Sequence, residues 1–222
     1  MKKRFLRGRR GLQLTSLVLG SLLCASTTSA EEQTASFTTQ VSGTASDQEY
    51  IDAHVRQADG TYRFTKDSSI SYKNTDDENT GVIRPLEDVK IDASDHVLTV
   101  ETNTDDGKKT AAVKNSGKNL DIKAGTLRLL TNDQYNSHPD YSWGILNESG
   151  TTTVSGMTEI NAVGYKSSRA VEATEGKVLL EGLEAKVAEY GDALSLLAGR
   201  SGQIFVNTKD GATGSHTVNL IG

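Results

Sequence analysis

Small, aliphatic and polar residues follow one another in a phrase that occurs four times in the second half of this chain. Each copy begins with a small residue and an aliphatic one, passes through a short polar step to a glycine, and ends where apolar and polar residues alternate. The copies span residues 112–122, 144–154, 170–180 and 193–206. The leading glycines are spaced by 33, 26 and 26 residues, at Gly117, Gly150, Gly176 and Gly202. Self-similarity of this kind predicts one structural unit stacked on itself.

Each repeat has room for three short strands and the turns between them, given strands of roughly 5 residues and tight connections. Stacking such coils aligns like strands into parallel sheets, with aliphatic residues inside and glycines at the corners. We therefore predict an all-β fold, a parallel β-helix or solenoid, over residues 81–222. An antiparallel β-sandwich is the alternative, but its hairpins would repeat at every strand pair, and here the similarity returns only after a whole coil. Residues 185–197 have some helical character, but the repeat predicts a strand that starts at Ala193-Leu194.

Shorter alternating segments precede the repeats. Residues 62–64, 70–72, 89–93 and 97–100 each predict a strand, and Ser94-Asp95 predicts a turn between the last two. Residues 31–46 are rich in Ser, Thr, Gln and Ala, which is typical of a flexible leader. We predict that residues 31–80 form this leader and an irregular N-terminal cap over the first coil. The chain ends on an alternating segment without a polar cap, so the solenoid is expected to be incomplete at its C-terminus.

A cationic segment followed by an apolar run opens the chain. Six basic residues lie within positions 2–10, residues 11–23 are mostly apolar, and small residues lead up to Ala30. This predicts a secretory signal peptide over residues 1–30, because the apolar run is too short to span a bilayer. A membrane anchor and lipidation of Cys24 are the alternatives. Removing the signal leaves no cysteine and a net charge of 18 − 29 = −11, since six of the 24 basic residues and none of the 29 acidic ones are lost. This acidity argues against a nucleic-acid partner.

Three features of the sequence resemble one protein family. They are the basic, extended signal peptide, the line D-V-K-I-D-A-S-D-H-V-L-T-V at 88–100, and the recurrent A-V-x-x-x-x-G-x-V-x-L and G-I-x-x-x-x-G-x-x-x-V phrases. Together they are similar to the passenger of a Gram-negative autotransporter, over residues 82–222. The resemblance implies a right-handed parallel β-helix of the pectin-lyase-like type, exported through the Sec pathway to the cell surface, outer membrane or extracellular space. The family's C-terminal barrel-forming strands are missing, so contact with the membrane is expected only through such a segment beyond Gly222.

The clusters of polar residues have no clear catalytic or metal-binding pattern. Glycoside cleavage needs two carboxyls facing one sugar bond, whereas Asp76-Asp77 and Asp105-Asp106 lie in polar, loop-like runs typical of solvated charge. These runs contain oxygen ligands for calcium but match no EF-hand loop. The four histidines are scattered, and no G-x-S-x-G occurs. We predict no catalytic residue, no metal and no cofactor.

One insertion, residues 131–142, lengthens the first repeat interval. Together with the residue that follows, it gathers aromatic and histidine side chains in a chain with only 5% aromatic residues: Tyr135, His138, Tyr141 and Trp143. Aromatic rings with a polar handle are favoured contact residues, and inserted loops often carry function. We predict that these four residues form a binding surface. The alternative is that Tyr141 and Trp143 pack against the side of the solenoid.

These observations predict a non-catalytic, adhesin-like protein exported to the cell surface. Its stacked coils would form a stiff rod, and its inserted loops would contact a host-surface protein or glycan. The alternative is a carbohydrate-active β-helix enzyme of the polysaccharide lyase or glycosidase type, which rests on fold analogy. Polysaccharide cleavage that depends on Asp105 or Asp106 would separate the enzyme from the binding protein.

Overall fold

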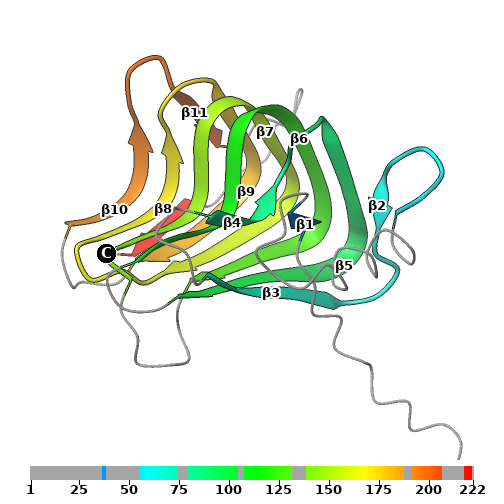
Figure 1. Ribbon diagram of the computed structural model, residues 1–222, viewed down its shortest axis with the longest axis horizontal. Coiled ribbons are helices and arrows are strands. Elements are labelled where there is room, and N and C mark those ends of the chain that lie inside the picture. The colour runs from blue at the N-terminus through cyan, green and yellow to red at the C-terminus, as the bar shows by residue number, and fades with distance from the viewer. Residues whose placement is uncertain are drawn as a thin grey trace, which may run out of the picture. The chain divides into compact units, whose positions relative to one another are not determined.

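Parallel strands stacked coil upon coil form the structure (Figure 1). The computed structural model describes residues 37–38, 56–74, 80–104, 108–131, 139–187, 192–206 and 218–221, all within one compact unit, 33–222. Every pairing between its named strands is parallel, and the antiparallel bridge among these residues joins Arg56 to Tyr62. The predicted all-β parallel solenoid is confirmed, and the antiparallel sandwich is wrong.

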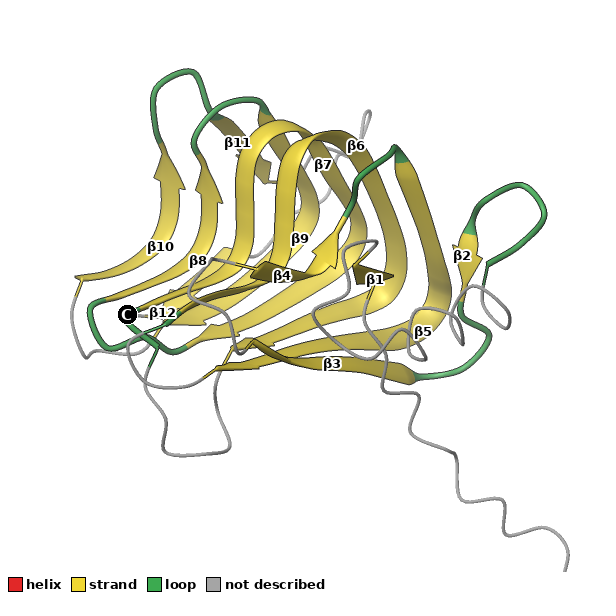
Figure 2. Cartoon of the chain, in the orientation of Figure 1, coloured by secondary structure: helices red, strands yellow, loops and turns green. Residues whose placement is uncertain are grey.

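Strands are the regular secondary structure throughout the described ranges (Figure 2). No helix there is long and apolar enough to cross a membrane. In chain order the strands are β1 (Phe37–Thr38), β2 (Tyr62–Arg63), β3 (Ser68–Asn74), β4 (Thr80–Arg84), β5 (Val89–Thr104), β6 (Lys109–Thr131), β7 (Tyr141–Ala162), β8 (Ser167–Ala173), β9 (Lys177–Val187), β10 (Asp192–Ala198), β11 (Gln203–Val206) and β12 (Val218–Ile221).

The strand pairings define three faces of the solenoid. The first face contains β1, β4, the first part of β6, the first part of β7, β8 and β10. The second contains β2, the middle parts of β6 and β7, the first halves of β5 and β9, and β11. The third contains β3, the ends of β5, β6, β7 and β9, and β12. Residues 80–104, 109–131, 141–162 and 167–187 thus form four complete coils of three strand segments each, as the repeat length predicts.

Strands that pass through several faces bend at the predicted corners. The pairing of β5 with β6 shifts between Ala93 and Val97, around the predicted Ser94-Asp95 turn, where Asp95 has φ of 67°. Residues 188–191 lie outside the described residues, but β9 extends to Val187 and β10 begins at Asp192. The strand prediction for residues 185–197 is therefore confirmed on both sides of that gap, because stacking on β7 and β8 outweighs local helical propensity.

The core is a column of aliphatic side chains aligned from coil to coil. On the second face Ile91, Ile122, Val154 and Leu180 occupy one register position and are all buried. Burial of each such side chain stabilises the fold by roughly 1.5–3 kcal/mol. The column explains how a chain with few aromatic residues fills its interior.

The small–aliphatic pair that opens each repeat lies in the first face and points into this core. Both members are buried in three coils, as Ala112-Val113, Gly144-Ile145 and Ala170-Val171. A Cβ atom on Gly144 would lie 2.4 Å from Cγ2 of Ile160, so the first position admits only a small residue. In the next coil Leu196 pairs with Val171, and Ala193 pairs with Ser168. The predicted alignment of Ala193-Leu194 with this pair is wrong by two residues, because A-L-S-L-L offers an aliphatic side chain at several positions.

Two asparagines stack at a corner between the first and second faces. Asn115 and Asn147 are paired in register and fully buried. Nδ2 of Asn115 donates to the carbonyl oxygens of Lys118 (2.9 Å) and Thr151 (3.2 Å). Nδ2 of Asn147 donates to the carbonyl oxygen of Glu175 in the following coil (3.0 Å). Each side chain thus satisfies backbone groups that the corner removes from the strand ladders. The sequence pattern marks both residues only as part of a polar step and does not reveal this role.

Three predicted segments lie wholly or partly outside the described residues. The signal peptide (1–30) lies entirely outside them, as does most of the predicted leader. Within the predicted leader, β1 pairs with β4, and within the predicted cap, β2 and β3 pair with β5. Of the predicted insertion, Thr131 ends β6 while Tyr141 and Ser142 begin β7, and residues 132–138 are not described.

Candidate functional site

The predicted binding surface is described at two of its four residues. Tyr135 and His138 lie outside the described residues. Tyr141 and Trp143 lie at the start of β7, with their ring centroids 5.9 Å apart and their planes inclined by 14°. Alternate residues of a strand point to the same side, which allows this stacked arrangement.

Trp143 is packed into its surroundings and only 8% exposed. It forms a small apolar cluster with Ala111 and Leu146, separate from the main core, and Tyr141 packs against it. We call these four residues the aromatic cluster. The indole Nε1 donates a hydrogen bond to Oε2 of Glu172 at 2.5 Å, and Glu172 also pairs with Arg169. Trp143 therefore serves mainly as a rigid support, while the half-buried Tyr141 forms the accessible part of the cluster.

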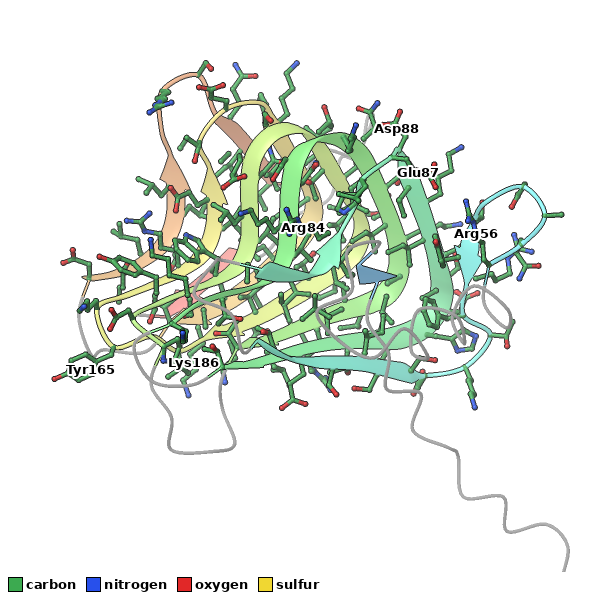
Figure 3. The ribbon with its side chains drawn as sticks, viewed as in Figure 1. Arg56, Arg84, Glu87, Asp88, Tyr165 and Lys186 are labelled. Carbon is green, nitrogen blue, oxygen red and sulfur yellow. The ribbon has the colours of Figure 1, made fainter. Side chains whose placement is uncertain are left out.

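Charged groups surround the accessible side of Tyr141. The Lys109 ammonium lies 5.3 Å from the centre of its ring, within the range of a cation–π interaction. Asp140, which precedes Tyr141, forms an ion pair of 2.6 Å with Lys166, and the hydrogen bond that Lys166 donates to Asp140 raises the pKa of Lys166. Tyr165, from the turn before β8, is 55% exposed (Figure 3). The cluster thus has an aromatic centre with charged groups beside it.

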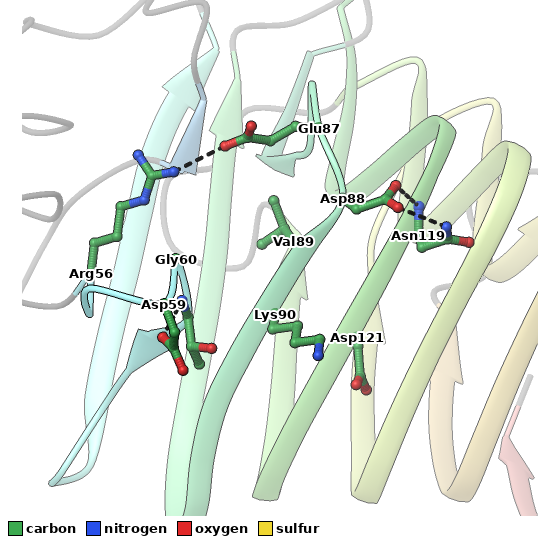
Figure 4. A pocket seen from close by; sticks show the side chains of 10 residues that line it. Arg56, Asp59, Gly60, Glu87, Asp88, Val89, Lys90, Asn119 and Asp121 are labelled. Atoms are coloured by element: carbon green, nitrogen blue, oxygen red, sulfur yellow. Dashed lines mark hydrogen bonds and ion pairs between the residues drawn. The ribbon is translucent and has the colours of Figure 1, made fainter.

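A cleft of about 490 Å³ lies on the outside of the second face (Figure 4). One wall is the turn of residues 57–61, closed by hydrogen bonds from Gln57 N to Thr61 O (2.8 Å) and from Gly60 N to Gln57 O (2.9 Å). The other wall is formed by the start of β5 and the middle of β6. We call it the hairpin cleft, and its lining residues are Arg56, Asp59, Gly60, Thr61, Glu87, Asp88, Val89, Lys90, Asn119 and Asp121.

Two contacts between neighbouring coils shape the hairpin cleft. Nη2 of Arg56 lies 3.1 Å from Oε1 of Glu87 and ties the turn to the coil stack. Asp88 accepts hydrogen bonds from both the backbone N and Nδ2 of Asn119, each 2.9 Å long. Sequence reasoning missed this cleft, although Asp59-Gly60 is a recognised turn signal. Nothing in the local pattern places that turn beside residues 87–90 and 119–121.

Hydrogen bonding keeps two carboxylates of the cleft ionised. The backbone N–H and then the side chain of Asn119 lower the pKa of Asp88 below its ordinary value of 3.8. Thr61 lowers the pKa of Asp59 in the same way, chiefly through its backbone N–H. The general acid of a glycosidase needs a raised pKa so that it carries a proton at neutral pH. These two carboxylates are therefore suited to accepting hydrogen bonds and unsuited to donating a proton.

An acid titration should reveal the depressed pKa of Asp88. Because its folded pKa lies below 3.8, Asp88 stabilises the fold above that pH and loses its contribution as the pH falls through the folded value. Replacing Asn119 with alanine removes the side-chain donor but keeps the backbone donor, so the pKa should rise part of the way towards 3.8. Carboxyl chemical shifts followed by NMR would measure this. Asp92, which Ser94 holds at low pKa, is the internal control and should not move.

The carboxylate pairs and histidines considered as candidate catalytic or metal-binding residues lie mostly outside the described residues. Both carboxylate pairs, Asp76-Asp77 and Asp105-Asp106, lie outside them. Of the four histidines His96 is described, and its Nδ1 lies 3.8 Å from Oδ1 of Asp67. Within the described ranges no three His, Cys, Asp or Glu side chains gather as metal ligands. A smaller groove of about 220 Å³ lies on the third face, lined in part by Arg128, Glu159 and Lys186.

Comparison with known proteins finds no counterpart for this arrangement. No protein-family model, no curated protein sequence and no solved structure matches the chain.

Proposed function

We propose that this chain is an exported, non-catalytic surface protein that presents binding residues on a stiff parallel β-solenoid. The observation that carries the proposal is the fixed position of Tyr141. Its ring stacks on Trp143, which Glu172 holds by a hydrogen bond, and Lys109 lies over it. Aromatic side chains fixed in advance lose little conformational entropy on binding, so they are effective contact residues.

The proposed location at the cell surface rests on the resemblance to autotransporter passengers. The parallel coils agree with the architecture that this resemblance implies, and the first thirty residues have the pattern of a signal peptide. In this proposal the chain belongs to a passenger whose coils hold Tyr141 away from the cell. A host-surface protein or glycan is the proposed partner.

Two carboxylates of the hairpin cleft are suited to accepting hydrogen bonds and unsuited to the role of a general acid. Asp59 and Asp88 have lowered pKa values and each accepts hydrogen bonds from a neighbouring residue. Such groups hold a polar partner without protonating it. The alternative, a carbohydrate-active enzyme, is tested by the polysaccharide assay below.

Adhesion of the purified chain to cultured epithelial cells tests this proposal. The wild-type protein, labelled with a fluorophore, should remain bound after washing, and Tyr141→Ala should bind about tenfold less, as expected for loss of an aromatic contact worth more than about 1 kcal/mol. Phe205→Ala is the matched control, since Phe205 is an exposed aromatic residue on β11. Equal retention of both variants would refute the role of Tyr141. Release of reducing ends from acidic or neutral polysaccharides would refute the non-catalytic proposal and show that the chain is a carbohydrate-active enzyme.

A further inference from the structure

The hairpin cleft is a second candidate site, separate from the aromatic cluster. It lies on the outside of the second face, whereas Tyr141 and Trp143 belong to the first. Its volume of about 490 Å³ falls within the roughly 300–1,000 Å³ of small-molecule sites. Figure 4 shows the lining side chains of the turn, of β5 and of β6, with the contacts of Arg56 with Glu87 and of Asp88 with Asn119.

The charged groups that line the cleft already face polar or opposite-charge partners. Arg56 is paired with Glu87, and both oxygens of Asp88 are engaged by Asn119. Lys90 and Asp121 are direct neighbours across β5 and β6, since the two residues are paired in register. A strongly charged ligand would have to compete with these partners and to lose its own hydration. The lining holds two basic and four acidic side chains, a formal charge of −2, which disfavours an anionic ligand, and a cationic ligand would have to compete with the partners already in place.

The same groups keep hydrogen-bonding capacity beyond these pairs. A carboxylate accepts up to about four hydrogen bonds and a guanidinium donates about five. Glu87 is 63% exposed and receives one hydrogen bond from Arg56, which is itself 40% exposed. The lining thus offers both donors and acceptors: a guanidinium, an ammonium, an amide and four carboxylates. A chain of hydroxyl groups, each of which donates and accepts, matches this lining without disturbing the ion pairs.

We infer that the hairpin cleft binds a neutral oligosaccharide, held by hydrogen bonds between its hydroxyl groups and the side chains of Arg56, Glu87, Lys90 and Asp121. Lys90 and Asp121 lie on the paired strands β5 and β6. Arg56 and Glu87 are joined by the ion pair that anchors the turn. The site is thus assembled before the ligand arrives, which lowers the entropic cost of binding. The inference does not depend on adhesion through Tyr141.

Titration of the full chain with defined trisaccharides, followed by NMR, tests the inference. The neutral probes are maltotriose, cellotriose and mannotriose, and the charged probes are trigalacturonic acid and the fully deacetylated glucosamine trimer. We expect saturable shifts of the Gly60 and Asn119 backbone amides with at least one neutral probe, and weaker binding of both charged probes. Tighter binding of a charged probe, or no saturable shift with any neutral one, would overturn the inference.

Single substitutions locate the binding. Lys90→Ala changes an exposed side chain on a strand and should raise the dissociation constant about tenfold, the loss of one hydrogen bond to a charged group. Arg128→Ala, in the groove on the third face, is the matched control and should bind as the wild type does. An unchanged dissociation constant in Lys90→Ala would refute the cleft as the site. A chain that binds a neutral trisaccharide here but fails to adhere to cells would refute the proposed function and leave this inference standing.

Discussion

Replacing Gly176 with alanine should strongly destabilise this protein, because the added methyl group meets backbone atoms of the preceding coil. Gly176 lies between β8 and β9 with φ of +79°. A Cβ atom there would lie 2.2 Å from the carbonyl oxygen of Gly150. The positive φ costs an alanine about 1–2 kcal/mol, and forcing neighbouring coils apart adds about 1–3 kcal/mol. We expect a total loss of about 2–5 kcal/mol in the free energy of unfolding.

Gly60 provides the control that separates these two costs. Its φ of +81° is nearly that of Gly176, but a Cβ atom there would meet no atom within 4 Å. Gly60→Ala should therefore lose only the conformational part, about 1–2 kcal/mol. Urea unfolding followed by circular dichroism measures both variants against the wild type. If Gly176→Ala and Gly60→Ala lower the free energy of unfolding by the same amount, contact with the preceding coil is not what requires glycine at position 176.

Replacing Asn147 with alanine should have the second largest effect. The side chain is fully buried and connects its own coil with the next through the carbonyl oxygen of Glu175. Its Oδ1 also accepts the hydroxyl hydrogen bond of Thr152 at 2.8 Å. Alanine would leave the buried Thr152 hydroxyl and the part-buried carbonyl oxygen of Glu175 without these bonds; the first loss costs about 1–3 kcal/mol and the second less. We expect a loss of about 2–4 kcal/mol, measured by the same unfolding experiment.

A double-mutant cycle with Thr152→Val identifies the origin of that loss. If the hydrogen bond between the two side chains matters, the double variant should lose less than the sum of the single variants, with a coupling of about 1 kcal/mol. Strict additivity would indicate that Asn147 acts only through the backbone. Asn119→Ala is the matched surface exchange and should shift the unfolding midpoint much less, because that side chain is exposed.

The sequence determined the architecture because the same pattern of small, aliphatic and polar residues occurs four times. A pattern that returns after a whole coil requires each strand to pair with its equivalent in the next coil, and the structure has that arrangement in four complete coils. The same argument correctly assigned strands on both sides of residues 188–191 against local helical propensity. The corner at Gly176 was also predictable, because a glycine recurs at this place in each repeat and glycine readily adopts the positive φ that a corner can require.

Only the tertiary structure decided which side chains meet between coils. Arg56 and Glu87, and likewise Asp88 and Asn119, are 31 residues apart in sequence and become neighbours through stacking. Their meeting depends on the exact register between coils, which the alternating pattern leaves open, as the two-residue error at Ala193 shows. Hydrophobic periodicity specifies which side of a strand faces the core, whereas the partner of a polar residue is set by the backbone geometry of the next coil. For this reason the asparagine stack and the hairpin cleft emerged from the structure, and the solenoid emerged from the sequence.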